Sequence, residues 1–351
     1  MYKIFTYCCV LLLFCGVILQ AQDAHFSQNF ATPLYANPAM SGLYDGDVRV
    51  SAVYRNQWAS LSNSSVGART VLLSAEAKLT PGPTKGGWLS GGINLYNDKT
   101  GGVGIITNSL DFSLAYNTPI DGKQFISVGT TVGMSGRKLD LSDAQFGNQY
   151  GEVGFDENIN SNETFDNESF SSFNLSGGLV YYYVKSPRSY YFGGLALYNI
   201  TGPRYSFQDF TDTRLPMRIS AQAGAAVNIN SNLDVVPSVY FMKQGKSVKT
   251  DIGSYVRFVF SQNKQQRTFR AFNIGPFVRV AGSTESSVSF DALVFAAKVD
   301  YDDISIGMSY DFNISKLNNA TNGRGGPELA VVYTPKIREN KFSAPVSCPR
   351  F

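Results

Sequence analysis

Histidine and cysteine are almost absent from this sequence. It contains one histidine, His25, and four cysteines, of which three lie within the first 15 residues. If those residues are removed as a leader, Cys348 remains alone and no internal disulfide can form. A single histidine supplies neither a usual zinc site nor the Ser–His pair of a hydrolase. We therefore predict that the chain has no disulfide framework, no metal or other cofactor, and no enzymatic activity.

Charged residues are also scarce. They make up 16% of the chain, with 30 basic and 27 acidic residues for a net charge of +3. The basic residues are scattered rather than clustered, which argues against nucleic acid as a partner. Aromatic residues reach 13%, with 20 Tyr, 25 Phe and 33 Gly. This composition favours strands over helices.

Only one long apolar run is present, and it lies at the N-terminus. Lys3 precedes an apolar stretch over residues 4–19, and Ala21 stands where a signal peptidase would cut. The stretch is about 16 residues long, whereas a membrane helix needs roughly 20. We predict a signal peptide over residues 1–21 and therefore export. A lipidated leader at Cys15 is the alternative, disfavoured because a bulky phenylalanine precedes it. The lack of later runs excludes a bundle of transmembrane helices.

After residue 47 almost every stretch alternates apolar and polar residues, the period of a strand with one apolar face. In residues 304–313 every even position is apolar and every odd one is small or polar. An even number of roughly ten-residue antiparallel strands is typical of single-chain outer-membrane barrels. The runs predict fourteen strands, over residues 47–56, 67–79, 88–97, 104–117, 124–136, 172–185, 190–200, 217–229, 235–243, 248–261, 268–281, 286–299, 304–313 and 328–335.

Apolar and polar residues also alternate in the strands of a soluble β-sandwich or propeller. The lengths of the connections between strands distinguish a membrane barrel from these folds. Connections after odd-numbered strands include the long ones, near 57–66, 137–171, 201–216 and 314–327, whereas those after even-numbered strands are short. Extracellular loops of outer-membrane barrels are long and their periplasmic turns are short. We predict an all-β, transmembrane, antiparallel up-and-down barrel over residues 47–337, in the outer membrane lipid, with both termini in the periplasm.

Aromatic residues gather near the predicted short turns, where a girdle at the membrane interface is expected. They are Tyr116, Tyr181, Tyr182, Tyr183, Tyr190, Tyr191 and Tyr333.

Basic residues on the predicted lumen faces leave two interpretations open. They could select anions in a pore, or pair with acidic residues and fill a closed lumen. Fourteen strands enclose a cavity but fall short of the 16 to 18 of open porins, so the strand number does not decide. The basic residues are Arg49, Arg55, Arg218, Arg257 and Arg279, and the acidic candidates are Glu76, Asp111, Asp251 and Asp291.

The longest predicted connection, residues 137–171, is acidic. Clustered carboxylates can bind calcium, but their spacing lacks the Asp-x-Asp-x-Asp-Gly pattern, and the intervening Asn, Ser and Gly suit a solvated surface. We therefore favour a solvated or partner-binding outer loop. Its candidate residues are Asp156, Glu157, Glu163, Asp166 and Glu168.

Residues 23–58 resemble a known family. They contain the runs Phe26-Ser27-Gln28-Asn29-Phe30, Asn37-Pro38-Ala39 and Tyr54-Arg55-Asn56-Gln57-Trp58. They look like the N-terminal signature of the PorP/SprF family, membrane components of the type IX secretion system of Bacteroidetes. The closing Cys348-Pro349-Arg350-Phe351 also resembles the end of SprF-like members.

The resemblance implies an outer-membrane protein that supports secretion or surface anchoring of adhesins and other cargo with a C-terminal sorting domain, often linked to gliding motility. It also implies contact with periplasmic peptidoglycan-associated secretion components. The alternative is a FadL-like outer-membrane transporter of small hydrophobic compounds, because Asn37-Pro38-Ala39 also resembles the N-terminal hatch of those fourteen-stranded barrels. The segment before the first strand is short for such a hatch.

Residues 22–46 are predicted to form a compact plug or partner segment in the periplasmic mouth, with Tyr35 and Met40 adding apolar contacts. Prolines there resist helix and central-strand geometry, and glycines permit sharp turns. The candidate residues of this segment are Phe26, Phe30, Pro33, Leu34, Asn37, Pro38, Ala39 and Gly42. A periplasmic tail over residues 338–351 offers further candidate contacts, Cys348, Pro349, Arg350 and Phe351.

Overall fold

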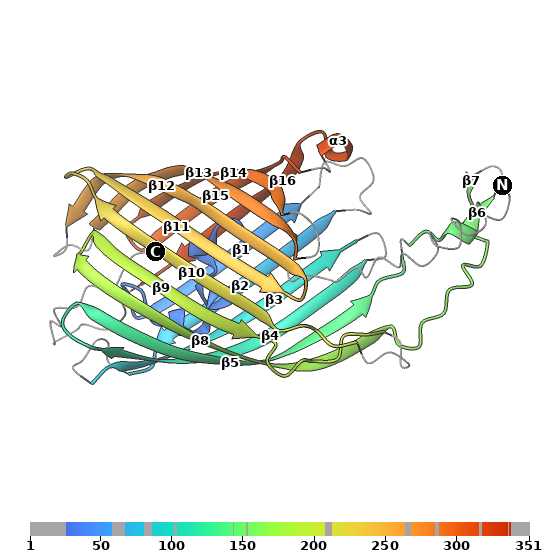
Figure 1. Cartoon of the computed structure of the whole chain (residues 1–351), viewed down its shortest axis with the longest axis horizontal. Coiled ribbons are helices and arrows are strands. Elements are labelled where there is room, and N and C mark those ends of the chain that lie inside the picture. The colour runs from blue at the N-terminus through green and yellow to red at the C-terminus, as the bar shows by residue number, and fades with distance from the viewer. Residues whose placement is uncertain are drawn as a thin grey trace.

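A computed structural model describes residues 26–57, 67–80, 86–101, 104–142, 144–151, 154–207, 213–263, 268–284, 288–315, 318–335 and 337. Fourteen antiparallel strands of the described chain close one barrel (Figure 1). The strands are β1 (Val48–Gln57), β2 (Ala68–Lys78), β3 (Trp88–Thr100), β4 (Ile105–Pro119), β5 (Gln124–Leu139), β8 (Ser169–Ser186), β9 (Ser189–Tyr198), β10 (Arg218–Asn228), β11 (Leu233–Gln244), β12 (Ser247–Asn263), β13 (Thr268–Ser283), β14 (Ser289–Tyr301), β15 (Ile304–Asn313) and β16 (Arg324–Tyr333). The predicted signal peptide, His25 and the tail over 338–351 lie outside the described residues.

The predicted fourteen-stranded barrel is confirmed, and each predicted strand overlaps an observed one. Neighbours in the chain pair with each other, and β1 pairs with β16 to close the barrel, from Val50 opposite Tyr333 to Arg55 opposite Glu328. Side-chain burial alternates along the strands, as in β15, where odd-numbered polar residues face the lumen and even-numbered apolar ones face outward. Alternation therefore sorts the two faces as the sequence indicates.

The largest difference from the predicted strands is at β16, which begins at Arg324 and not at residue 328. Gly325, Gly326 and Pro327 are poor strand formers, which hides this extension in the sequence. The glycines are required because the neighbouring strands approach closely. A Cβ on Gly325 would lie 2.0 Å from the Asp311 carbonyl oxygen, and one on Gly326 would lie 2.3 Å from that of Asn56.

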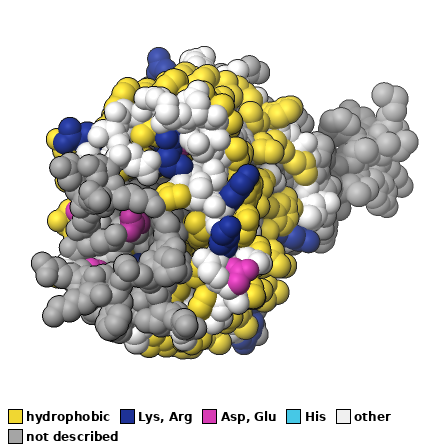
Figure 2. All heavy atoms as spheres, turned by 90° about the vertical axis from the view of Figure 1, so that its left-hand side faces the viewer, with side chains coloured by type: hydrophobic (Ala, Val, Ile, Leu, Met, Phe, Trp, Pro, Cys, Tyr) yellow, Lys and Arg dark blue, Asp and Glu magenta, His cyan; other side chains and the backbone are white. Residues whose placement is uncertain are grey.

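The outer face of the barrel is apolar. Its exposed side chains include Leu73, Leu95, Phe112, Val132 and Phe295. Figure 2 looks onto the short-turn end, and it shows hydrophobic side chains around the periphery with Lys and Arg on the end face. Such a surface suits the hydrocarbon region of a membrane.

Connections differ between the two ends of the barrel. At one end, residues 120–123, 187–188 and 302–303 form tight turns. The other end, called here the long-loop end, carries residues 199–217 and the longest connection, 140–168. That connection, called here the arm, extends away from the barrel and carries a hairpin of β6 (Tyr150–Gly151) and β7 (Gly154–Phe155) (Figure 1). None of the described helices is long and apolar enough to span a membrane.

The predicted aromatic girdle is wrong at two positions. Tyr182 and Tyr190 point into the lumen and are only 2% and 3% exposed. Tyr116, Tyr181 and Tyr191 are exposed on the outer face, as expected. Consecutive residues of a strand point to opposite faces, so a run of adjacent tyrosines cannot lie entirely at the lipid interface.

We expect Gly326→Ala to weaken barrel closure, because its Cβ would meet the β1 backbone at Asn56. Overpacking of this kind costs roughly 1–3 kcal/mol. Gly136→Ala is the matched control, since the nearest atom to its Cβ lies 3.9 Å away. Heat-modified mobility on gels and thermal melting measure the effect. Equal melting of the two variants would show that the close approach at Gly326 is unimportant.

Candidate functional site

The segment before β1 lies inside the barrel. Residues 26–47, called here the lumen segment, form three short helical turns, η1 (Asn29–Ala31), α2 (Pro33–Ala36) and η2 (Pro38–Met40). All eight candidate residues of the segment lie in the lumen, where Phe30 is half-buried and the others are buried. A chain segment buried in this way needs hydrogen-bond partners for its backbone groups, and the barrel wall supplies them.

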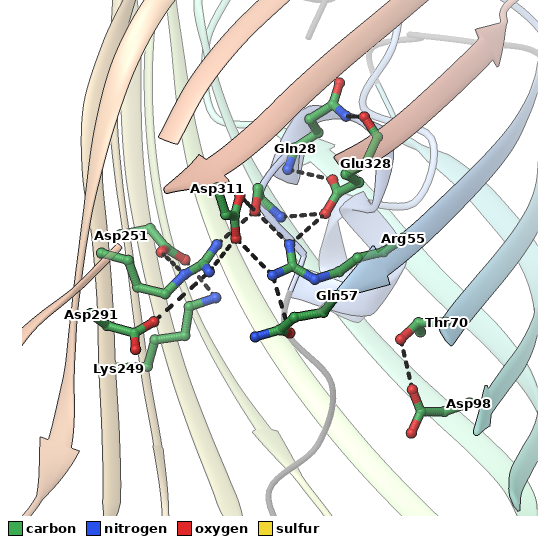
Figure 3. A network of polar contacts seen from close by, with 12 residues as sticks. Gln28, Arg55, Gln57, Thr70, Asp98, Lys249, Asp251, Asp291, Asp311 and Glu328 are labelled. Atoms are coloured by element: carbon green, nitrogen blue, oxygen red, sulfur yellow. Dashed lines mark hydrogen bonds and ion pairs between the residues drawn. The ribbon is translucent and has the colours of Figure 1, made fainter. Parts of the chain in front are cut away.

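On one side of the lumen, the carboxylate of Glu328 on β16 holds the start of the segment. It accepts the backbone N–H of Ser27 at 2.8 Å and that of Gln28 at 2.8 Å. The Gln28 side-chain amide donates in turn to the Glu328 carbonyl oxygen at 2.9 Å. Arg55 on β1 donates both to Glu328, at 3.1 Å, and to the Ser27 hydroxyl, at 2.7 Å (Figure 3). Chain residues about 300 positions apart are thus joined directly.

The same contacts continue as a row of buried charges across β12 to β1 (Figure 3). Arg55 pairs with Asp311 at 2.7 Å, and Arg279 pairs with Asp311 at 2.6 Å and with Asp251 at 2.9 Å. Lys249 closes the row by pairing with Asp251 at 2.6 Å. Positive and negative groups alternate along the row, so each buried charge has an opposite neighbour. Unpaired charges would be costly in this environment.

A second wall carboxylate, Glu76 on β2, holds the end of the segment. It accepts the backbone N–H of Gly42 at 3.1 Å and pairs with Arg49 at 2.6 Å. Tyr44 donates to the Glu76 carbonyl oxygen at 3.0 Å, while Lys78 donates to the Tyr44 carbonyl oxygen at 2.8 Å. Wall carboxylates therefore bind the lumen segment near both of its ends.

Three of the five predicted lumen arginines, Arg49, Arg55 and Arg279, form close ion pairs with acidic residues, as one of the two interpretations expected. Among the predicted partners, Glu76 and Asp251 form close ion pairs, whereas Asp291 is 4.0 Å from Arg279 and partly exposed. Asp311 and Glu328 are the partners that the sequence did not single out. Arg218 instead lies over the rings of Tyr35, at 4.7 Å, and Tyr198, at 4.0 Å, and Arg257 donates to Asn273 at 2.9 Å.

Asn37 fixes the middle of the segment. Its side-chain oxygen accepts the backbone N–H of Ala39 at 2.9 Å, and so caps η2. Its amide nitrogen donates to the carbonyl oxygens of Leu179, at 3.2 Å, and Leu195, at 3.1 Å, on β8 and β9. Pro38 occupies the first turn, where no backbone donor is needed. The Asn-Pro-Ala run is therefore explained by local capping and wall contact together.

Glycines of the wall make room for the segment. A Cβ on Gly178 would lie 2.0 Å from the Asn37 side-chain oxygen, and one on Gly129 would lie 2.6 Å from the Ala39 nitrogen. A Cβ on Gly307 would lie 2.2 Å from the Gln28 side-chain oxygen. These glycines come from β5, β8 and β15, so the wall is shaped on several sides to receive this segment.

The arm, residues 140–168, contacts the barrel at its base. The Asn167 backbone N–H donates to the Phe207 carbonyl oxygen at 3.1 Å, and Phe207 packs edge-on against Phe170. Lys99 pairs with Asp140 at 2.7 Å. A hydrogen bond from the Lys99 side chain, with help from Ser142, lowers the pKa of Asp140 to about 2, so this carboxylate stays ionised near neutral pH.

The five candidate acidic residues of the arm are all exposed. Asp156 accepts bonds from the backbone and side chain of Asn158, both at 2.9 Å, in a local turn. Within the described residues no group of three or more His, Cys, Asp or Glu is placed to hold a metal ion. The arm therefore presents dispersed carboxylates to solvent. The candidate tail residues Cys348, Pro349, Arg350 and Phe351 lie outside the described part of the chain.

A closed barrel with an apolar outer face and a segment folded into its lumen defines the class: this is an integral membrane β-barrel protein. Residues 18–333 match the model of a family described as type IX secretion system membrane protein PorP/SprF. The chain belongs to the PorP/SprF family, as the resemblance of residues 23–58 predicted, and so to the outer-membrane β-barrels. None of the curated proteins compared with it matches.

Solved structures similar to the chain include several channels, all at low sequence identity. CymD, a monoaromatic hydrocarbon channel, has 9% identity and a TM-score of 0.48, covering 90% of this chain and 94% of its own. The toluene transporter TbuX of Ralstonia pickettii has 9% identity and a TM-score of 0.46, covering 88% and 94%. A TodX monoaromatic hydrocarbon channel variant has 10% identity and a TM-score of 0.47, covering 87% and 94%. Likeness at this level carries no argument about ligands.

Substitutions at two adjacent glycines test whether the wall at Gly178 is shaped to contact the lumen segment. We expect Gly178→Ala to displace Asn37 and to lower the melting temperature, with faster proteolysis of the segment. Gly177→Ala is the control, because its Cβ would have no neighbour closer than 3.9 Å. Thermal melting and limited proteolysis of the purified barrels provide the readout. Identical melting and proteolysis of the two variants would contradict the close contact between Gly178 and Asn37.

Glu328→Gln tests whether the Glu328 carboxylate binds the start of the lumen segment. The substitution keeps the shape of the side chain but removes the charge that Arg55 faces, and breaking a buried pair costs roughly 3–5 kcal/mol. We expect a clear loss of stability in chemical unfolding, with a change within about 0.5 kcal/mol for the exposed control Glu168→Gln. A Glu328→Gln barrel as stable as the control would mean that this carboxylate does not hold the segment.

Proposed function

We propose that the protein is a docking platform of the type IX secretion system, which supports secretion or surface anchoring of cargo adhesins with a C-terminal sorting domain. The observation that carries this proposal is the occupied lumen within a barrel of this family. A folded cargo domain cannot share a fourteen-stranded lumen with a segment that is bound by Glu76 and Glu328 of the wall and, through its own Asn37, to β8 and β9. Its part in secretion is therefore assigned to its surfaces, and no catalytic step is required of it.

The long-loop end is proposed to face the cell exterior, with both termini on the periplasmic side. Long outer loops and short periplasmic turns support this orientation. The arm would then meet cargo at the cell surface. Its exposed Asp156, Glu157 and Glu163 favour a partner with a basic face, since charge complementarity steers such encounters. Gliding motility would follow where the cargo is a motility adhesin.

The periplasmic side is proposed to contact peptidoglycan-associated components of the secretion machinery. The tail, with Cys348, Pro349, Arg350 and Phe351, follows β16, which ends at the short-turn end, and would emerge on that side. Because Glu76 binds the end of the lumen segment near the short turns, a contact at that end would be transmitted to β2 and β1 through Glu76 and Arg49.

Uptake of small hydrophobic compounds is the second candidate function. The observation that favours it is an apolar cavity of about 90 Å³ beside the lumen segment, lined in part by Phe30, Tyr255 and Phe277. Uptake of a labelled hydrocarbon by cells that carry or lack the protein separates this function from secretion.

Charge reversal on the arm tests the docking proposal. We expect Asp156→Lys, Glu157→Lys and Glu163→Lys together to deplete at least one large protein from the cell surface several-fold, while the barrel itself stays in the membrane. The matched control exchanges Asp and Glu at the same three positions and keeps the charge. Quantitative proteomics of cell surface and medium gives the measurement. An unchanged surface proteome, in this variant and in a deletion strain, would overturn the secretion role.

A further inference from the structure

The lumen segment does not fill the barrel evenly, and the space that it leaves has its own chemistry. A cavity of about 90 Å³ lies between the segment and the wall of β9 to β14. Its lining is mainly apolar, with Phe30 and Met40 from the segment and Phe192, Tyr255 and Phe277 from the wall. Lumen walls of large barrels are usually polar, so an apolar cavity here is unexpected.

One polar side chain in this lining has no partner. Gln222 on β10 is only 7% exposed, and neither its amide nitrogen nor its amide oxygen has a hydrogen-bond partner within the described structure. An amide buried without a partner costs free energy, on the order of 1–3 kcal/mol. Its two atoms together can accept one hydrogen bond and donate another, which is what a hydroxyl group requires.

The charged groups of the lining are already satisfied. Lys298 pairs with Asp300 at 3.3 Å, and Arg257 donates to Asn273 at 2.9 Å. Asn273 donates in turn to Asp300 at 2.8 Å. A charged ligand would have to disrupt this network, so the cavity favours a neutral molecule.

We infer that this cavity binds a small neutral amphiphile, with an apolar body against Phe30, Met40 and Phe277 and one hydroxyl group paired with the Gln222 amide. The size limits the body. An apolar protein cavity of roughly 150 Å³ holds benzene, and the space of about 90 Å³ here is smaller. It suits a chain of a few carbons, and a single aromatic ring fits only when a flexible side chain such as Met40 moves aside. The inference is independent of the secretion role, because it concerns binding by the barrel alone.

Phenol and toluene are suitable probes, since they differ by the hydroxyl group. The full barrel in lipid nanodiscs, with ¹³C-labelled methionine methyl groups, reports where each one binds. We expect phenol to shift the Met40 signal by its ring current. Met134 and Met308 face outward with 61% and 63% exposure, so they report binding from the membrane instead. Shifts confined to the outward methionines would overturn the inference.

Gln222→Leu tests the role of the amide. We expect it to weaken phenol binding roughly tenfold while leaving toluene binding within about threefold, because only phenol loses a hydrogen bond. Gln244→Leu is the matched control, as Gln244 is equally buried, at 3% exposure, and does not line the cavity. Unchanged phenol affinity in Gln222→Leu would contradict the proposal. If that variant fails to assemble, equal affinity of the natural chain for phenol and toluene would do so.

Discussion

A backbone carried into a barrel lumen must find partners for its N–H groups, and two buried carboxylates provide them here. Glu328 accepts the N–H groups of Ser27 and Gln28, and Glu76 accepts that of Gly42. Each carboxylate also faces an arginine of β1, Arg55 or Arg49. The lumen segment, the closing seam of the barrel and the row of lumen charges therefore depend on the same groups.

This dependence explains why the charged side chains of the row are paired with one another and not left facing an empty lumen. The row from Lys249 to Glu328 places each positive group beside a negative one, and the hydroxyl of Ser27 enters the row by donating to Asp311. A segment bound this way acts as part of the wall. What remains for partners is the arm at one end, the short-turn face at the other, and the apolar cavity that the segment leaves beside β9 to β14.

Much of the fold was predictable, because two-residue alternation records which face of each strand meets lipid. Alternation failed at the start of β16, where Gly325 and Gly326 are set by the close approach of neighbouring backbone and hide the strand. The aromatic girdle failed for another reason: adjacent tyrosines were assigned to one face although alternation places them on opposite faces. The sequence of the lumen segment identified it as a candidate site, but the wall residues that bind it could not be predicted from the sequence. Asp311 and Glu328 reach Ser27 only through the register of a closed barrel, and Gly178 is informative only once Asn37 lies against it.

Amide hydrogen exchange of the lumen segment tests the central claim most directly, since it reads the bonds that Glu328 and Glu76 accept. If the segment is part of the wall, the amides of Ser27, Gln28 and Gly42 exchange as slowly as those in the middle of β1 and β16. Exchange of these three amides at the rate of an unprotected chain, in a barrel whose strands stay protected, would contradict the account.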